Sequence, residues 1–210
     1  LFYCCYLLFE TGLLGVAATG DAFNLFVFLE IASLASYVLV SFGQDRRALS
    51  AAFRYLILGT LGATFYLIGV GLLYQATGTL NFADLADRVQ LVEDSRTIRT
   101  AFAFFTVGIL LKLALFPLHL WLPNTYAFAP SVVTAFLAGT ATKVALYVLI
   151  RIFFSLFGVQ FSFGAMSISI VIIPLAIVAI FIGSITAIFE HNIKRMLAYS
   201  SIAQIGYMVL

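Results

Sequence analysis

The stretch GILLKLALFPLHLWLP, residues 108–123, decides the fold, because it places a charged side chain inside an apolar run long enough to enter a membrane. Lys112 has apolar neighbours on both sides, and Pro117 follows five positions later. A second lysine, Lys143, lies inside the next apolar segment, AFLAGTATKVALYVLI, residues 135–150. A lysine at the centre of a membrane helix costs about 2.5–3.5 kcal/mol on insertion scales. Two lysines in successive segments therefore predict an ion or proton path through the bundle interior.

The composition predicts an integral membrane protein. Of the 210 residues, 63% are hydrophobic and 10% are charged, and the mean hydropathy is +1.12. Soluble domains are about half apolar and about one quarter charged. The net charge of +2 is small and gives no indication of nucleic acid binding. The chain starts at Leu1 and stops inside an apolar run, with no signal peptide, so we expect an internal piece of a longer protein.

Seven apolar runs predict an all-α, polytopic bundle. A membrane-spanning helix needs about 20 residues, and runs of that length are far longer than the strands of a membrane barrel. The predicted runs cover residues 1–20, 22–42, 51–75, 100–122, 131–157, 167–190 and 196–210.

Loop charges predict the orientation. Basic residues lie in the loops 44–49 and 190–195, which are separated by four crossings and therefore share one side. The positive-inside rule makes that side cytoplasmic. We expect the membrane to be the cell's inner (plasma) membrane. The loop 76–99, with four acidic residues against three arginines, then lies outside.

That outer loop carries an amphipathic pattern. One helical stripe is apolar, whereas Asp84, Asp87 and Arg88 face away and Asn81 is placed to cap the helix. A short helix on the membrane surface and a merely packed loop are both compatible with the pattern. The stripe consists of Phe82, Leu85, Ala86, Val89 and Val92.

No motif predicts a catalytic centre, a metal or a cofactor in this chain. His119 and His191 are far apart, and the adjacent Cys4 and Cys5 pair with neither, so no metal-ligand spacing is present. There is no phosphate-binding loop, dinucleotide fingerprint or catalytic triad. The glycine pairs Gly12/Gly15 and Gly59/Gly62 are interpreted as close helix packing.

Three ionisable residues are predicted to lie at one depth. Glu30, Lys112 and Lys143 each fall near the middle of their apolar runs, which suits a lateral chain of proton sites across the bundle. The alternative is a static buried ion pair that fixes helix packing. Other polar residues are spaced so that they lie on the same helix face as these charged residues. Ser33 and Tyr37 share the face of Glu30, and Thr140, Tyr147 and Arg151 share the face of Lys143.

A proton carrier must exchange protons near neutral pH, whereas an exposed lysine titrates at about pH 10.4. Burial can lower the pKa of a lysine by several units, and a nearby carboxylate raises it again. Movement of Glu30 relative to Lys112 would therefore switch the lysine between holding and releasing its proton. Lys143 would be the next proton site after Lys112.

Pro117 is predicted to break its helix just past Lys112, since it lacks an N–H and clashes with the carbonyl of Leu113. Transporters place broken helices at ion sites. A simple proline kink is the alternative. His119 follows the break in the sequence. It would either relay protons toward the cytoplasm or donate a hydrogen bond to a carbonyl that the break frees. Glu10 is either an auxiliary site or a structural partner.

Four blocks of the sequence resemble one family. They are similar to the antiporter-like subunits of multi-subunit sodium/proton antiporters, above all the D subunit, and of the proton-pumping arm of NADH–quinone oxidoreductase (complex I). The blocks are GDAFNLFVFLEIASLASYVLV (20–40), RYLILGTLGATFYLIGVGLLYQATGTLNFADLA (54–86), KLALFPLHLWLPNTYAFAPSVVTAFLAGTATKVALYVLIR (112–151) and IKRMLAYSSIAQIGYM (193–208).

The resemblance implies two inverted five-helix repeats, each with a broken helix. This chain would hold the first repeat, approximately 1–157, and the start of the second, approximately 167–210, in a single transmembrane domain fragment. Glu30, Lys112 and Lys143 match the family's glutamate and two lysines.

The implied function is a proton-translocating subunit of a multi-subunit Na⁺ or K⁺/proton antiporter. The alternatives are a pumping subunit of complex I or of a membrane-bound hydrogenase, which leaves the enzyme class open, and a non-conducting scaffold. The implied partners are the lipid bilayer, other membrane subunits, protons and Na⁺ or K⁺.

Overall fold

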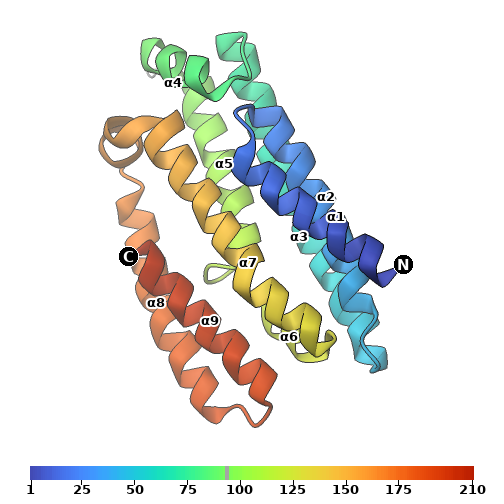
Figure 1. The fold of residues 1–210 in the computed structure, drawn as a ribbon. Helices are drawn as coiled ribbons and strands as arrows, with labels where there is room; N and C mark the ends of the chain where they lie inside the picture. Colours follow the sequence, from blue (N-terminus) through green and yellow to red (C-terminus); the bar gives the residue numbers. More distant parts are fainter. Residues whose placement is uncertain (93–94) are drawn as a thin grey trace.

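A computed structural model describes residues 1–92 and 95–210 and confirms the all-α bundle (Figure 1). Within these ranges there is no β-strand beyond one isolated bridge between Asp21 and Asn81. The helices are α1 Phe2–Ala18, α2 Ala22–Ser41, α3 Arg46–Thr77, α4 Phe82–Leu91, α5 Arg96–Leu113, α6 Leu122–Phe128, α7 Ser131–Ile150, α8 Ser169–Phe189 and α9 Ile193–Val209, with two π-helical segments, η1 Arg151–Leu156 and η2 Gln160–Ala165, between α7 and α8.

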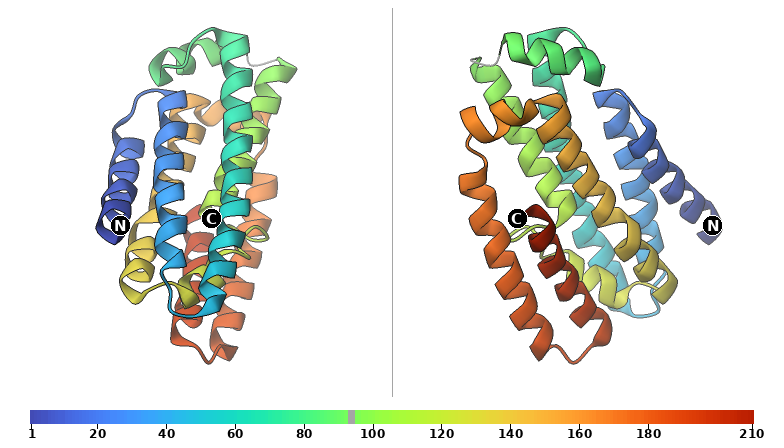
Figure 2. Two further views of the ribbon diagram at one scale, coloured as in Figure 1. Left: turned by 90° about the vertical axis from the view of Figure 1, so that its right-hand side faces the viewer. Right: turned by 60° about the vertical axis from the view of Figure 1, so that its left-hand side comes forward.

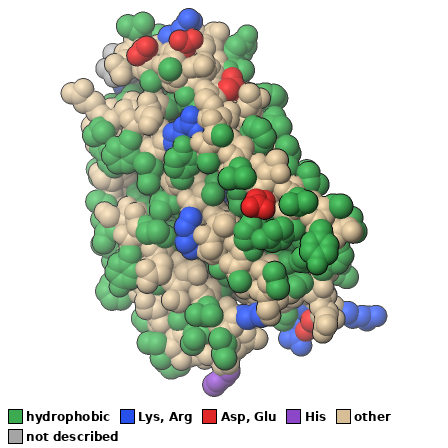
Figure 3. All heavy atoms as spheres, in the orientation of Figure 1, with side chains coloured by type: hydrophobic (Ala, Val, Ile, Leu, Met, Phe, Trp, Pro, Cys, Tyr) green, Lys and Arg blue, Asp and Glu red, His purple; other side chains and the backbone are tan. Residues whose placement is uncertain are grey.

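The long helices of the bundle pack side by side in a continuous series. α1 lies along α2, α2 along α3, and α3 along α5, which in turn contacts α7 (Figures 1 and 2). The α8–α9 hairpin contacts the rest of the bundle mainly through α9, which packs against α6. Charged side chains lie mainly at the two ends of the molecule, and the face between them consists of hydrophobic side chains, other side chains and backbone with few charged groups (Figure 3). This distribution is typical of a bundle surrounded by lipid.

The observed helices match most of the predicted runs. Among the described residues, four helical segments are long and apolar enough to cross a membrane, namely Ala22–Ser41, Arg46–Thr77, Ser131–Leu156 and Ser169–Phe189, and α1 is apolar but shorter. α3 begins five residues before the predicted run because Asp45 caps it, accepting a 2.9 Å hydrogen bond from the N–H of Arg47. The run 100–122 is not one helix, because α5 ends at Leu113.

The amphipathic helix predicted in the loop 76–99 is present as α4. The Asn81 side chain accepts a 2.9 Å hydrogen bond from the N–H of Ala83, and Phe82, Leu85 and Val89 are buried. The Arg151 guanidinium lies 4.4 Å from the centre of the Phe82 ring. These contacts fasten α4 over the end of the bundle. Two acidic residues of this loop, Glu93 and Asp94, lie outside the described residues.

The loops 44–49 and 190–195 lie at the same end of the bundle, as the four crossings predicted between them imply. Both line one hollow, together with residues 127–131. The Lys194 side chain lies at this end, and its ammonium donates a 2.9 Å hydrogen bond to the carbonyl oxygen of Ala129. The side-chain oxygen of Asn192 caps α9 by accepting from two backbone N–H groups.

Glycines allow α3 to approach its neighbours closely. A Cβ atom on Gly108 would lie 2.6 Å from the carbonyl oxygen of Gly62 and 2.9 Å from the backbone nitrogen of Tyr66. A Cβ atom on Gly59 would overlap the Tyr37 hydroxyl. The interpretation of Gly59 and Gly62 as packing residues is therefore confirmed, since backbones approach this closely only at small residues.

Gly108→Ala is expected to destabilise the bundle by about 1–3 kcal/mol, because the added methyl group meets backbone atoms that have no room to move. The matched control is Gly71→Ala in α3, where an added Cβ meets no atom within 4 Å. Thermal unfolding of the purified protein in detergent, followed by fluorescence of the single tryptophan, gives the measurement. Equal midpoints for the two variants would contradict the close packing of α3 against α5.

Candidate proton-transfer site

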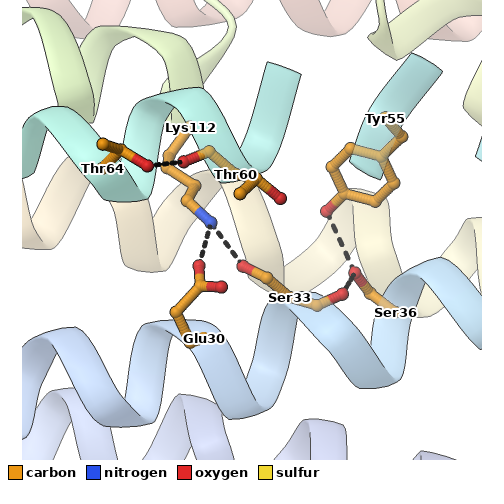
Figure 4. A network of polar contacts seen from close by, with 7 residues as sticks. All are labelled: Glu30, Ser33, Ser36, Tyr55, Thr60, Thr64 and Lys112. Atoms are coloured by element: carbon orange, nitrogen blue, oxygen red, sulfur yellow. Dashed lines mark hydrogen bonds and ion pairs between the residues drawn. The ribbon is translucent and has the colours of Figure 1, made fainter. Parts of the chain in front are cut away.

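α2 and α5 bring Glu30 and Lys112 together in the bundle. The Lys112 ammonium nitrogen lies 3.2 Å from Glu30 Oε1 and 2.6 Å from Ser33 Oγ (Figure 4). Glu30 and Ser33 are three positions apart on α2, so they share one face of that helix. The two charged side chains are only 11% and 20% exposed, for Lys112 and Glu30 respectively. The site is therefore a mostly buried ion pair with one additional hydroxyl.

The helix break lies immediately beyond Lys112, as predicted. α5 ends at Leu113, and Ala114 adopts a left-handed conformation with φ 61°, while Pro117 lies in the irregular segment that follows. The carbonyl of Leu111, freed by the break, accepts a 3.0 Å hydrogen bond from Trp121 Nε1. The carbonyl oxygens of Leu110 and Leu111 thus have hydrogen-bond partners inside the protein, as backbone groups in a membrane interior require.

Hydroxyl groups continue the polar contacts along α2. Ser36 Oγ donates a 2.7 Å hydrogen bond to the carbonyl of Ser33 and lies 3.2 Å from the Tyr55 hydroxyl (Figure 4). The Tyr55 ring stacks on Trp121 with centroids 4.3 Å apart and packs edge-on against Tyr37 at 4.5 Å. The break therefore positions Trp121 against a buried tyrosine beside the ion pair.

Lys143 lies apart from this pair, on an exposed face of α7. Its ammonium donates hydrogen bonds to the carbonyl of Ala138 at 2.6 Å and to Thr142 Oγ1 at 3.3 Å. Among the contacts of the described residues, none joins Lys143 directly to Glu30 or Lys112. The structure brings two of the three predicted charges into contact and leaves the third separate.

The auxiliary residues occupy different surroundings. His119 is buried, its ring stacks on Phe116 at 5.3 Å, and its Nδ1 has no hydrogen-bond partner within the described part of the chain. Tyr147 donates a 3.3 Å hydrogen bond to the carbonyl of Ala17 and so joins α7 to α1. Glu10 is exposed on α1, and no ion pair of the described residues includes it.

An apolar cavity of about 10 Å³ adjoins Lys112 on the side that faces α7. Its walls include Phe26, Ile109, Ala145 and Val148, which come from α2, α5 and α7. A cavity of this size has room for about one water molecule. The polar side chains that contact Lys112 lie on α2, whereas the α7 residues that line this cavity are apolar.

Sequence reasoning missed α6, Tyr55, Trp121 and Tyr126. The pair Leu122–Pro123 was an available signal for α6, because proline favours the first turn of a helix. Tyr55 and Trp121 gave no signal, since each lies in an apolar run where burial is the ordinary expectation, and Tyr126 lies between two predicted runs. Among the residues that the structure describes, no group of three or more His, Cys, Asp or Glu side chains is placed to hold a metal ion.

The buried ion pair thus lies at the end of a broken helix inside an apolar helical bundle of the membrane-spanning class. Residues 19–210 match the family described as NADH:quinone oxidoreductase/Mrp antiporter, transmembrane. The chain belongs to this family and is a multi-pass membrane protein.

The chain is similar to relatives of two kinds. It is 50% identical to the N subunit of NADH-quinone oxidoreductase from Desulforudis audaxviator, over 100% of this chain and 41% of that protein. It is 35% identical to the D subunit of a Na⁺/H⁺ antiporter from Alkalihalophilus pseudofirmus, over 100% of this chain and 42% of that protein. A subunit of the membrane-bound sulfane sulfur reductase, an archaeal respiratory membrane complex, aligns with TM-score 0.87 and 35% identity over 98% of this chain and 42% of that one. The chain thus spans about two fifths of the length of these relatives.

The Glu30–Lys112 pair is expected to be energetically coupled, because removing one partner leaves a buried charge alone. Glu30→Gln, Lys112→Gln and the double variant form the cycle, with a coupling energy of about 1–3 kcal/mol in thermal unfolding. The control is Asp45 with Arg47, which lie 3.4 Å apart and are exposed at 44% and 74%. Its coupling should stay below about 1 kcal/mol. Additive effects of the two substitutions at Glu30 and Lys112 would contradict the pairing.

Proposed function

We propose that this chain is a proton-translocating membrane subunit in which Glu30, Lys112 and Lys143 carry protons across the bundle. The single observation that supports the proposal best is the position of the Glu30–Lys112 pair, mostly buried and one residue before a helix break. Ionisable residues inside membranes are costly and are usually functional. A broken helix at membrane depth gives such a pair a backbone that can shift.

The chemistry follows from the contacts of the ammonium group. The Glu30 carboxylate at 3.2 Å favours the charged form of Lys112. Ser33 Oγ, at 2.6 Å, accepts a hydrogen bond from the Lys112 ammonium. Withdrawal of Glu30 would leave the ammonium in an apolar environment and favour release of its proton. Ser33 lies where it would receive that proton first.

The proposed setting is a multi-subunit complex in the plasma membrane. One candidate is a Na⁺ or K⁺/proton antiporter, supported by the similarity to the D subunit of such an antiporter. The second is a quinone oxidoreductase or another respiratory complex, which the 50% identity to an oxidoreductase N subunit favours. In either setting, residues up to about 157 would form one repeat and residues from about 167 would begin another.

Purification of the complex from its source membrane separates the two candidates. An antiporter predicts colourless preparations whose proton movement in vesicles depends on added Na⁺ or K⁺. An oxidoreductase predicts co-purifying flavin and iron–sulfur absorbance and proton movement that depends on a reductant.

Lys112→Arg is expected to impair proton movement severely, to nearly the level of Lys112→Ala. Arginine keeps the positive charge beside Glu30 but stays protonated in practice, so it binds a proton without releasing it. The measurement is the pH gradient across everted vesicles on adding the coupling cation or reductant, at matched membrane levels. Robust movement with Lys112→Arg would show that the site needs only a fixed charge and would make the pair structural.

A further inference from the structure

Two charged side chains in the apolar part of the bundle have no counter-charge among the described residues. Glu10 is the central residue of α1, and its exposed side chain makes no ion pair or hydrogen bond within the described part of the chain. The Lys143 ammonium contacts only the neutral carbonyl of Ala138 and the neutral hydroxyl of Thr142. Ionisable side chains inside membranes are costly and almost always pair. Each of the two residues has the sign of charge that the other needs.

α1 and α7 lie side by side and run in the same direction (Figure 1). Toward the start of both helices, the Phe136 ring stacks on Tyr6 with centroids 4.6 Å apart and packs edge-on against Phe9 at 5.3 Å. Toward their ends, the Tyr147 hydroxyl donates a 3.3 Å hydrogen bond to the carbonyl of Ala17. These two contacts bound the α1–α7 seam and determine which residues lie opposite each other along it.

Lys143 lies on the α7 face that forms this seam. It comes seven positions after Phe136 and four before Tyr147, and these spacings place all three on one helix face. Its ammonium turns back toward the start of α7, because it donates to the carbonyl of Ala138 at 2.6 Å. Ala138 is only two positions past Phe136, which is about 3 Å along the helix. The charge of Lys143 is therefore close to the level of the aromatic contact.

Glu10 lies on the matching face of α1. It comes four positions after Tyr6 and seven before Ala17, the two α1 residues that contact α7 at the two ends of the seam. The opposite side of α1 packs on α2, since a Cβ atom on Gly12 would lie 2.6 Å from the backbone nitrogen of Ala32. Glu10 is turned about 200° from Gly12 around the helix and therefore faces away from α2.

The two charges also lie at about the same depth. Glu10 directly follows Phe9, which contacts Phe136, and the Lys143 ammonium contacts the carbonyl two residues past Phe136. The ammonium and Glu10 are therefore within about one helical turn of each other along the seam.

We propose that Glu10 is the counter-ion of Lys143 and that the two side chains form an ion pair across the α1–α7 seam. No ion pair of the described residues joins them in this structure. Both side chains are exposed, so their approach needs rotation about side-chain bonds and no movement of a helix. An ammonium group has three N–H donors, and two of those of Lys143 are used by Ala138 and Thr142. The third is available to the carboxylate.

The ion pair itself does not depend on the proposed function, whereas its effect on proton movement does. In that setting Glu10 is a positioning residue, because its carboxylate favours the charged form of Lys143 and draws the ammonium toward α1. Each of the two lysines would then have its own carboxylate, Glu30 for Lys112 and Glu10 for Lys143.

Charge reversal tests the pair. Glu10→Lys and Lys143→Glu each place two like charges at the seam, whereas the double variant restores opposite charges. We expect the double variant to recover about half or more of the summed loss in unfolding midpoint, measured on the full-length subunit in detergent. Where a single reversal prevents assembly, recovery of the membrane level by the double variant gives the same result. Losses that simply add would overturn the ion pair.

Thr11→Lys is the matched control for Glu10→Lys. Thr11 is also exposed and lies one position further along α1, but it is turned about 100° around the helix from Glu10. Lys143→Glu should therefore recover none of the loss caused by Thr11→Lys. Equal recovery with Thr11→Lys and Glu10→Lys would show that the seam does not select Glu10, and would overturn the proposal.

Proton movement in everted vesicles tests the positioning role at matched membrane levels. Glu10→Gln is expected to reduce it by about threefold or more, and Glu10→Asp by less than about twofold, because aspartate keeps the carboxylate. Unchanged movement with Glu10→Gln would overturn the positioning role.

The outcomes separate this proposal from the proposed function. If Lys112→Ala abolishes proton movement while the reversals at Glu10 and Lys143 simply add, the ion pair is wrong and the proposed function stands. If the double reversal recovers stability while Lys112→Ala retains proton movement, the ion pair stands and the proposed function is wrong.

Discussion

The ammonium group of Lys112 is the constraint on which the structure depends. A charge in an apolar bundle needs a counter-charge and hydrogen-bond acceptors, and a single face of α2 supplies both through Glu30 and Ser33. That contact fixes the rotation of α2 about its axis. It also requires α5 to lie close to α2 and α3, and the approach of Gly62 to Gly108, one turn before the lysine, provides this closeness.

The helix break imposes a second constraint, because every backbone carbonyl that it frees needs a hydrogen-bond donor. The N–H of Ala114 turns back toward Leu110 and Leu111, and the indole of Trp121 donates to Leu111. The indole is therefore held at the break, and its flat face is available for Tyr55. One polar demand of the backbone thus determines where a buried aromatic hydroxyl lies, a few residues from the ion pair.

Charges and prolines made much of this fold predictable. The apolar runs, the break past Lys112, and the cap and stripe of α4 follow from local rules, because helix period, N-cap chemistry and the missing N–H of proline act within a few residues. The π-helical segments after Ile150 gave no such signal. The separation of Lys143 from Lys112 was also out of reach, since both residues have the same apolar flanks and only tertiary packing distinguishes them. The tyrosine cluster was missed for the same reason.

The difference between the two lysines has its own consequence. Lys112 has a carboxylate partner, whereas the contacts of Lys143 within the described residues are a carbonyl and a hydroxyl, both neutral. Glu30 therefore favours the charged form of Lys112 against the burial of that side chain, whereas no carboxylate of the described residues pairs with the more exposed Lys143. Withdrawal of Glu30 would remove this stabilisation and leave the Lys112 ammonium beside its apolar cavity wall. Under the proposed function, movement of this one carboxylate would change how strongly Lys112 holds its proton, while the neutral contacts of Lys143 would stay the same.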